Sequence, residues 1–98
     1  MLLKLGVDIS RLKPEIRRSL KTVESIFWTL SEREAIITST FEGSHKVASL
    51  HYANQAIDVR LPELKRAEIF QAIADALGKD YDVINEVDHF HVEYDPKG

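Results

Sequence analysis

The stretch QAIDVRLPELKRAEIFQAIADALG, residues 55–78, contains both kinds of element from which this chain is built. Residues 55–61 alternate in polarity, which predicts a half-buried strand with Asp58 on its polar face. Pro62 then opens a helix that Gly78 is suited to end in a left-handed conformation. The apolar stripe of this helix consists of Leu64, Ala67, Phe70, Ile73, Ala74 and Leu77. Because this strand is followed directly by the helix, we expect both kinds of element in the same small domain.

The remaining elements are predicted from the same two patterns, alternation for strands and an apolar stripe for helices. An apolar stripe at steps of four and three predicts a helix over 14–30, made by Ile16, Leu20, Val23, Phe27 and Leu30. Short strands are predicted at 35–39, 81–87 and 90–94, the last two joined by a tight connection at 88–89. The polar stretch 40–53 is expected to be a loop that is either functional or disordered. The fold class is therefore α+β, with two helices packed on one side of a small, largely antiparallel sheet.

Composition limits the classes of function. With 98 residues the chain forms one domain, 1–98, and its 44% apolar residues can build a core. It has no cysteine, so a metal site must use His, Asp and Glu. The net charge of −3 and the lack of a basic face argue against nucleic acid as a partner. No apolar run predicts membrane insertion or a signal peptide, so we expect synthesis as a soluble cytoplasmic chain.

Two segments carry the candidate chemistry: SLHYANQAID at 49–58 and DHFH at 88–91. If their strands share a sheet, Asp58 and His91 project toward a common point, and a bend brings His51 over the strand end. Two imidazoles and one carboxylate are typical of catalytic zinc, whose fourth position is left to water. The sequence thus predicts Zn²⁺ as cofactor, with His51, Asp58 and His91 as metal ligands.

Asp88 is the predicted catalytic residue. It lies three residues before His91, in a turn, so its carboxylate can take a proton from the metal-bound water and pass it to the departing amine. Lys46 and His45 are candidates for stabilising the oxyanion of a hydrolysed amide. Glu86 and Glu93 are alternative carboxylates.

Three residues near these segments have more than one interpretation. His89 could support a ligand, contact substrate or lie exposed in a turn, and the last is favoured. For His45, an ordinary loop histidine is as well supported as an oxyanion role. Ser49 is expected to cap the loop, with substrate contact as the alternative.

These segments also resemble a known family. The pattern Ser-x-His-x-x-Gly-x-Ala-x-Asp, followed by Glu/Asp-x-x-His, is similar to that of zinc D-alanyl-D-alanine carboxypeptidases. That family includes D,D-dipeptidases and L-alanyl-D-glutamate endopeptidases, and small phage-encoded members are the most similar. Ser49, His51, Ala56 and Asp58 match the first motif, and Asp88 with His91 match the second. The resemblance implies the same three zinc ligands and the same catalytic carboxylate.

The chain departs from the family pattern at three places. Asn54 stands where the family has glycine, and Asn tolerates the left-handed backbone best among other residues. His89-Phe90 replaces an aromatic pair before the last ligand. Glu42 stands near the place of an upstream arginine, so its role would pass to Lys46 or His45.

The predicted function is zinc-dependent hydrolysis of an amide in the peptidoglycan stem peptide, of the D-Ala-D-Ala carboxypeptidase or L-Ala-D-Glu endopeptidase type. The stem peptide is the expected partner, and access to the cell wall would come through a phage lysis system. The alternative is a catalytically inactive, zinc-stabilised binding or structural domain of the same fold. A third, weaker interpretation is a metal-free interaction domain. The residues do not indicate an oligomeric state.

Overall fold

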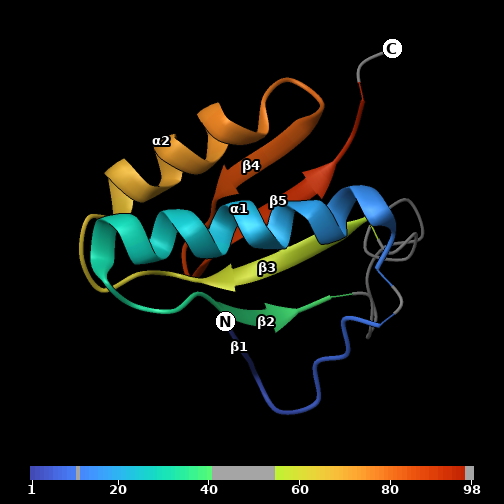
Figure 1. Cartoon of the computed structure of the whole chain (residues 1–98), viewed down its shortest axis with the longest axis horizontal. Helices are drawn as coiled ribbons and strands as arrows, with labels where there is room; N and C mark the ends of the chain where they lie inside the picture. The colour runs from blue at the N-terminus through green and yellow to red at the C-terminus, as the bar shows by residue number, and fades with distance from the viewer. Residues whose placement is uncertain (11, 41–54, 97–98) are drawn as a thin grey trace.

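The computed structural model describes residues 1–10, 12–40 and 55–96. Two helices pack on a five-stranded mixed sheet, which confirms the α+β prediction (Figure 1). The elements in chain order are β1 (Leu2–Leu3), α1 (Pro14–Ser31), β2 (Ile36–Ser39), β3 (Ala56–Arg60), α2 (Arg66–Leu77), β4 (Tyr81–Asn85) and β5 (His89–Tyr94).

The sheet has the strand order β1-β2-β3-β5-β4. All neighbours are antiparallel except β1, which pairs in parallel with β2. The sequence patterns did not predict β1, a strand of only two residues. The pairing of β3 with β5 places Asp58 directly opposite His91, and Arg60 opposite His89.

Helix α1 follows its predicted stripe. Ile16, Leu20, Val23 and Phe27 are buried against the sheet, and Leu30 packs at the margin of the core. Pro14 occupies the first turn, where its missing N–H costs no hydrogen bond. The predicted helix over 14–30 is therefore confirmed to within one residue.

Helix α2 begins four residues later than Pro62, the predicted start. Lys65 caps it in a left-handed conformation with φ of 58°, and the N–H of Ile69 donates to the carbonyl of Lys65 at 2.9 Å. Residues 62–65 are used to turn the chain from β3 onto the helix layer. Leu64 is consequently 64% exposed instead of lying in the stripe. Gly78 ends the helix with φ of 81°, a positive value as expected, although its ψ of −167° lies outside the left-handed helical region.

The hairpin of β4 and β5 differs from its predicted boundaries in a way that affects the site. The turn is formed by residues 86–88, and the N–H of Glu86 donates to the carbonyl of His89 at 2.9 Å. His89 is therefore the first residue of β5 and not part of the connection. Because side chains alternate along a strand, His89 shares a face with His91 and Glu93.

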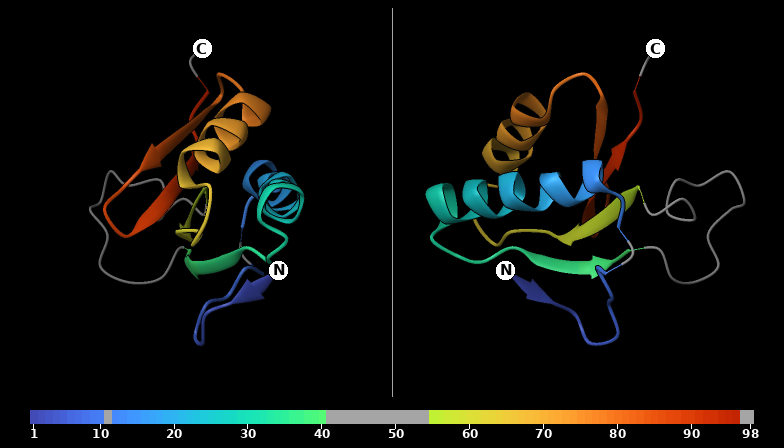
Figure 2. Two further views of the ribbon diagram at one scale, coloured as in Figure 1. Left: turned by 90° about the vertical axis from the view of Figure 1, so that its left-hand side faces the viewer. Right: turned by 45° about the vertical axis from the view of Figure 1, so that its right-hand side comes forward.

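The two faces of the sheet have different compositions. Both helices lie on one side, as the left view of Figure 2 shows, and the strand residues beneath them are fully buried. These are Ile37, Ile57, Val59, Phe90 and Val92. The opposite side, called the polar face below, carries Asp58, Arg60, Asp82, His89, His91 and Glu93. Within the described residues, neither helix has the length and apolar character needed to span a bilayer.

Candidate metal centre

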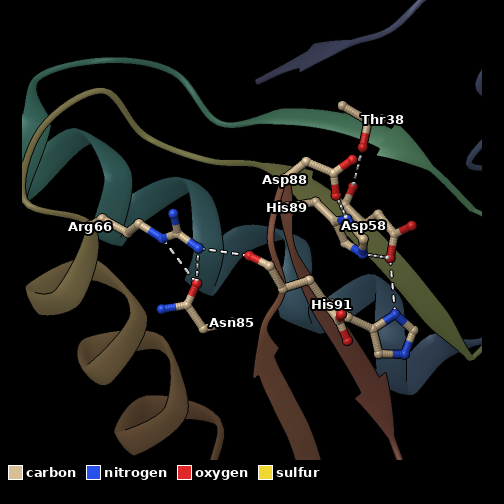
Figure 3. A network of polar contacts seen from close by, with 8 residues as sticks. Thr38, Asp58, Arg66, Asn85, Asp88, His89 and His91 are labelled. Atoms are coloured by element: carbon tan, nitrogen blue, oxygen red, sulfur yellow. Dashed lines mark hydrogen bonds and ion pairs between the residues drawn. The ribbon is translucent and has the colours of Figure 1, made fainter.

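The polar face brings three potential metal ligands together. Asp58 comes from the middle of β3, and His89 and His91 come from β5 beside it. One ligand atom from each of these residues lies within 4.8 Å of the other two. The residues could therefore hold a metal ion. Figure 3 shows the three side chains from close by.

The distances suit a small coordination sphere. Oδ1 of Asp58 lies 2.9 Å from Nδ1 of His91 and 3.6 Å from Nε2 of His89. Ligands about 2.0–2.1 Å from a tetrahedral metal lie about 3.3 Å from each other. The two distances fall on either side of that value, so small side-chain movements would bring the three atoms into coordination range.

In each imidazole, the ring nitrogen that does not face Asp58 contacts a second carboxylate. Nδ1 of His89 lies 2.6 Å from Oδ1 of Asp88, and Nε2 of His91 lies 2.7 Å from Oε1 of Glu93. In metal sites a carboxylate on the second ring nitrogen fixes the tautomer and the ring orientation of a ligating histidine. Both histidines thus direct one nitrogen toward Asp58 and the other toward a carboxylate.

Burial and charge make this region favourable for a cation. The side chains of Asp58 and His91 are only about 15% and 16% exposed. Burial by itself lowers the pKa of His91, but its hydrogen bonds to Asp58 and Glu93 and the attraction of both carboxylates outweigh it. The pKa of His91 is therefore raised above the ordinary value of 6.5. A bound metal ion would take the place of this proton.

The backbone of Asp58 is fixed as well as its side chain. The hydroxyl of Thr38 on β2 donates to the carbonyl of Asp58 at 3.4 Å. The register between β2 and β3 shifts near this point, between Ile37 and Ser39. Asp58 therefore sits in a central strand held from both sides, a rigid position for a ligand.

The candidate residues from the sequence fall into two groups. The structure brings Asp58 and His91 together and connects Asp88 to them through His89. His51, His45, Lys46 and Ser49 lie outside the described residues, as do Glu42 and Asn54. The predicted loop over 40–53 is described only at Thr40, which is buried and donates from its hydroxyl to the carbonyl of Asp8.

The interpretation of His89 as an exposed turn residue is wrong. Its side chain is 28% exposed, and it lies between the carboxylates of Asp88 and Asp58. The sequence did contain the signal for its true position, since His89, His91 and Glu93 stand at every second residue and so fall on one face of a strand. It was missed because the strand was predicted to begin one residue too late.

Asp88 was predicted to lie beside the metal, but the structure places it at the exposed hairpin turn, in contact with His89. Its side chain is 84% exposed at the hairpin turn, and its carboxylate contacts the imidazole of His89. Asp88 is thus linked to Asp58 through one intervening ring.

Comparison with protein-family models, with curated proteins and with solved structures gives no match for this chain.

Proposed function

We propose that this protein is a zinc-dependent hydrolase with Asp58 and His91 as two of its three metal ligands. The observation that supports this best is the 2.9 Å separation of Asp58 Oδ1 and His91 Nδ1, which lie on adjacent strands with a further imidazole within reach. Two imidazoles and one carboxylate form a donor set that is typical of hydrolytic zinc. This set leaves a coordination position for water.

The third ligand is either His89 or His51. The geometry favours His89, whose Nε2 faces Asp58 at 3.6 Å. The resemblance to zinc D-alanyl-D-alanine carboxypeptidases favours His51. The two alternatives assign different roles to His89, which in the second case would contact substrate or transfer protons beside the metal.

Asp88 is proposed as the proton acceptor. Zinc would supply a Lewis acid that polarises the amide carbonyl and acidifies water. Asp88 would take the proton released when the new carbon–oxygen bond forms, and would return it to the amine when the carbon–nitrogen bond breaks. Its exposed carboxylate and its contact with His89 support a role in proton transfer.

The proposed substrate is an amide bond in the peptidoglycan stem peptide. Support comes from the motif around Ser49, His51 and Asp58 and from the Asp88-x-x-His91 spacing, with Lys46, His45 and Ser49 as proposed substrate contacts. Cleavage would be of the D-Ala-D-Ala carboxypeptidase or L-Ala-D-Glu endopeptidase type. A small enzyme of this kind would reach the wall from the cytoplasm through a phage lysis system.

The test combines metal analysis with digestion of purified muropeptides. We expect the zinc-loaded chain to hold about one zinc ion and to release a peptide product detected by mass spectrometry. Asp58→Asn and His91→Ala should lose both properties. The matched control Glu68→Gln, an exposed acid on α2, should keep both. Intact muropeptides after incubation with zinc-loaded wild type and with Asp88→Ala alike would contradict the proposal.

The identity of the third ligand is resolved by comparing His89→Ala with His51→Ala. The variant that removes a ligand should lose zinc affinity by orders of magnitude. The other variant should retain zinc and change only kcat or KM. Equal retention of zinc in both variants would leave Asp58 and His91 without a third imidazole and would overturn the proposed ligand set.

A second candidate function follows from the position of His89. If His89 and His51 both bind the metal with Asp58 and His91, four protein ligands close the coordination sphere. Closed sites are typical of structural zinc. The chain would then be a zinc-stabilised binding or structural domain, which binds zinc tightly, unfolds on chelation and leaves muropeptides intact.

A further inference from the structure

Strand β1 forms one edge of the sheet, and within the described residues it has a neighbouring strand, β2, on one side only (Figure 2). The N–H groups of Leu2 and Lys4 donate to the carbonyls of Ala35 and Ile37, both at 2.9 Å. Successive residues of a strand direct their backbone groups to opposite sides, so the N–H and C=O of Leu3 point away from β2. Leu3 therefore offers a donor and an acceptor to a further strand.

The side chains at this edge are apolar and open to solvent. Met1, Leu2, Leu3 and Leu5 are all exposed, Leu3 to 41% and Leu5 completely. Edge strands are usually protected from pairing by charged side chains or proline. Residues 1–5 contain one charged side chain, that of Lys4, and no proline. This edge is therefore suited to pairing with another strand.

The opposite edge of the sheet is protected by charge. Strand β4 is longer than β1, but Asp80 precedes it, Asp82 lies within it and Glu86 follows it. Two copies joined along β4 would bring these carboxylates together, and like charges on facing strands are destabilising. Of the two edges, β1 is therefore the one that favours association.

We propose that two copies of this chain associate through their β1 edges, in antiparallel register about a two-fold axis at Leu3. The N–H of Leu3 in each copy donates to the carbonyl of Leu3 in the other, which forms one closely spaced pair of hydrogen bonds. The same register places Met1 of one copy opposite Leu5 of the other, and Leu2 opposite Lys4. The exposed apolar side chains are thereby covered by their own counterparts, as a two-fold interface requires.

Charge complementarity favours a second copy as the partner. Residues opposite each other on paired strands lie on the same face, so Lys4 of one copy lies beside Leu2 of the other. Leu2 and the exposed carboxylate of Glu34 line the same cavity, at the C-terminal end of α1. Among the described residues, Lys4 forms no ion pair within its own chain. The two-fold axis thus brings each Lys4 near Glu34 of the other copy.

The test begins with the mass of the chain, purified without added residues before Met1 and measured by analytical ultracentrifugation. Because the paired segment is short, we expect a weak dimer, with the mass rising from 11.2 kDa toward twice that value between about 1 μM and about 1 mM. The candidate metal ligands lie on β3 and β5, so the rise should be the same with zinc and after chelation.

Hydrogen exchange of the backbone amides tests the register. In the dilute protein the amide of Leu3 should exchange faster than those of Leu2 and Lys4, which are bonded to carbonyls within the chain. In the concentrated protein the exchange of Leu3 should slow by at least about tenfold.

Two variants at the axis test the pairing itself. Leu3→Lys and Leu3→Glu each place like charges opposite one another, so each variant alone should keep the mass of one chain. A mixture of the two should associate again, because residue 3 faces its own counterpart. This rescue shows that both variants are folded. Ile84→Lys, which changes an exposed apolar residue of β4, is the matched control and should associate like the wild type.

Four results would overturn the proposal. One is a mass of 11.2 kDa at every concentration. The second is association that Leu3→Lys leaves unchanged, and the third is association that Ile84→Lys abolishes. The fourth is growth beyond the dimer, which indicates that β1 pairs with β4 of the next copy in an open array. None of these results depends on whether the chain hydrolyses a peptide.

Discussion

At the scale of single residues, the polar face is organised around Asp58. Its carboxylate is approached by two imidazoles, and each of these is bonded to a further carboxylate, Asp88 or Glu93. Asp is uncommon in the middle of a strand because its side chain competes with the backbone for hydrogen bonds. Partners on the neighbouring strand explain how this chain accommodates it.

Asp88 can be tested by changing its charge while keeping its shape. If Asp88 only orients His89, Asp88→Asn should lower zinc affinity by about 10–100-fold, the usual effect of removing a carboxylate behind a ligating imidazole. If Asp88 is the proton acceptor, zinc affinity should stay near that of the wild type while kcat falls by about 10²–10⁴-fold. Competition with a zinc-binding dye and turnover measurements distinguish the two.

Glu86→Gln is the matched control for this prediction, because Glu86 lies in the same turn. It should change neither zinc affinity nor kcat. A loss of activity in Glu86→Gln equal to that of Asp88→Asn would contradict the assignment of Asp88.

Tyr81 gives a prediction about pH. Burial raises the pKa of its phenol, and the hydroxyl donates to the backbone carbonyl of Glu15 at the start of α1 at 2.7 Å. A group whose pKa is higher in the folded state stabilises the fold below its unfolded pKa, about 10, and loses this contribution as the pH rises through the folded pKa. Tyr81→Phe should therefore cost about 1 kcal/mol at neutral pH and progressively less in alkali.

Urea denaturation at neutral and alkaline pH measures the free energy of unfolding lost in Tyr81→Phe. In an absorbance titration of the phenols, the variant should lack the component that titrates at the highest pH. A cost that is constant across the alkaline range would contradict the prediction.

At the scale of elements, the hairpin of β4 and β5 is the part that positions the imidazoles. The guanidinium of Arg66, at the start of α2, donates from Nε and Nη2 to Oδ1 of Asn85 at 2.9 and 2.6 Å. Nη2 also donates to the carbonyl of Glu86 at 2.6 Å. Figure 3 shows this fork reaching from the helix to Asn85, the residue before the turn that contains Asp88. The helix thus fixes the end of the hairpin from which the site is built.

Arg66→Lys should weaken this attachment, because lysine lacks the planar fork of donors. These bonds are exposed, so we expect the free energy of unfolding to fall by only about 1 kcal/mol or less. Zinc affinity should fall by several-fold, since the turn that contains Asp88 and leads into His89 is less fixed. Calorimetric titration and urea denaturation measure the two effects. Equal zinc affinity in Arg66→Lys and wild type would show that the turn is positioned without this contact.

At the scale of the whole molecule, one face of the sheet forms the core and the other carries the candidate metal ligands. The face beneath α1 and α2 holds the apolar core, including Phe90 and Val92, which alternate along β5 with His89, His91 and Glu93. Because the same strands carry both core and candidate ligands, we expect metal binding to be coupled to folding.

This coupling predicts that zinc stabilises the fold. A ligand that binds only the folded state adds about 2.7 kcal/mol when its free concentration is a hundred times its Kd. Thermal unfolding should shift upward on addition of zinc and return on addition of a chelator. Asp58→Asn should fold without showing this shift, whereas Glu68→Gln should show it in full. An equal shift in Asp58→Asn would place the stabilising zinc elsewhere on the protein.

The sequence was informative wherever a periodicity is local. The stripe of Ile16, Leu20, Val23 and Phe27 predicted α1, because burial of a helix face requires that spacing whatever the partner. Alternation likewise predicted which sides of β3 and β5 are polar. The start of α2 was predicted wrongly, since Pro62 is as suitable for a turn as for a helix, and the path from β3 to the helix layer decided between them.

What the sequence by itself determined is the α+β composition of the chain and the polar side of each strand. Only the tertiary structure decided that β3 pairs with β5, that Asp58 stands opposite His91 and that His89 is a third neighbour. The pairing of Asp58 with His91 joins residues 33 positions apart, and its register depends on how the whole apolar face packs. A shift of one residue would have turned these side chains into the core.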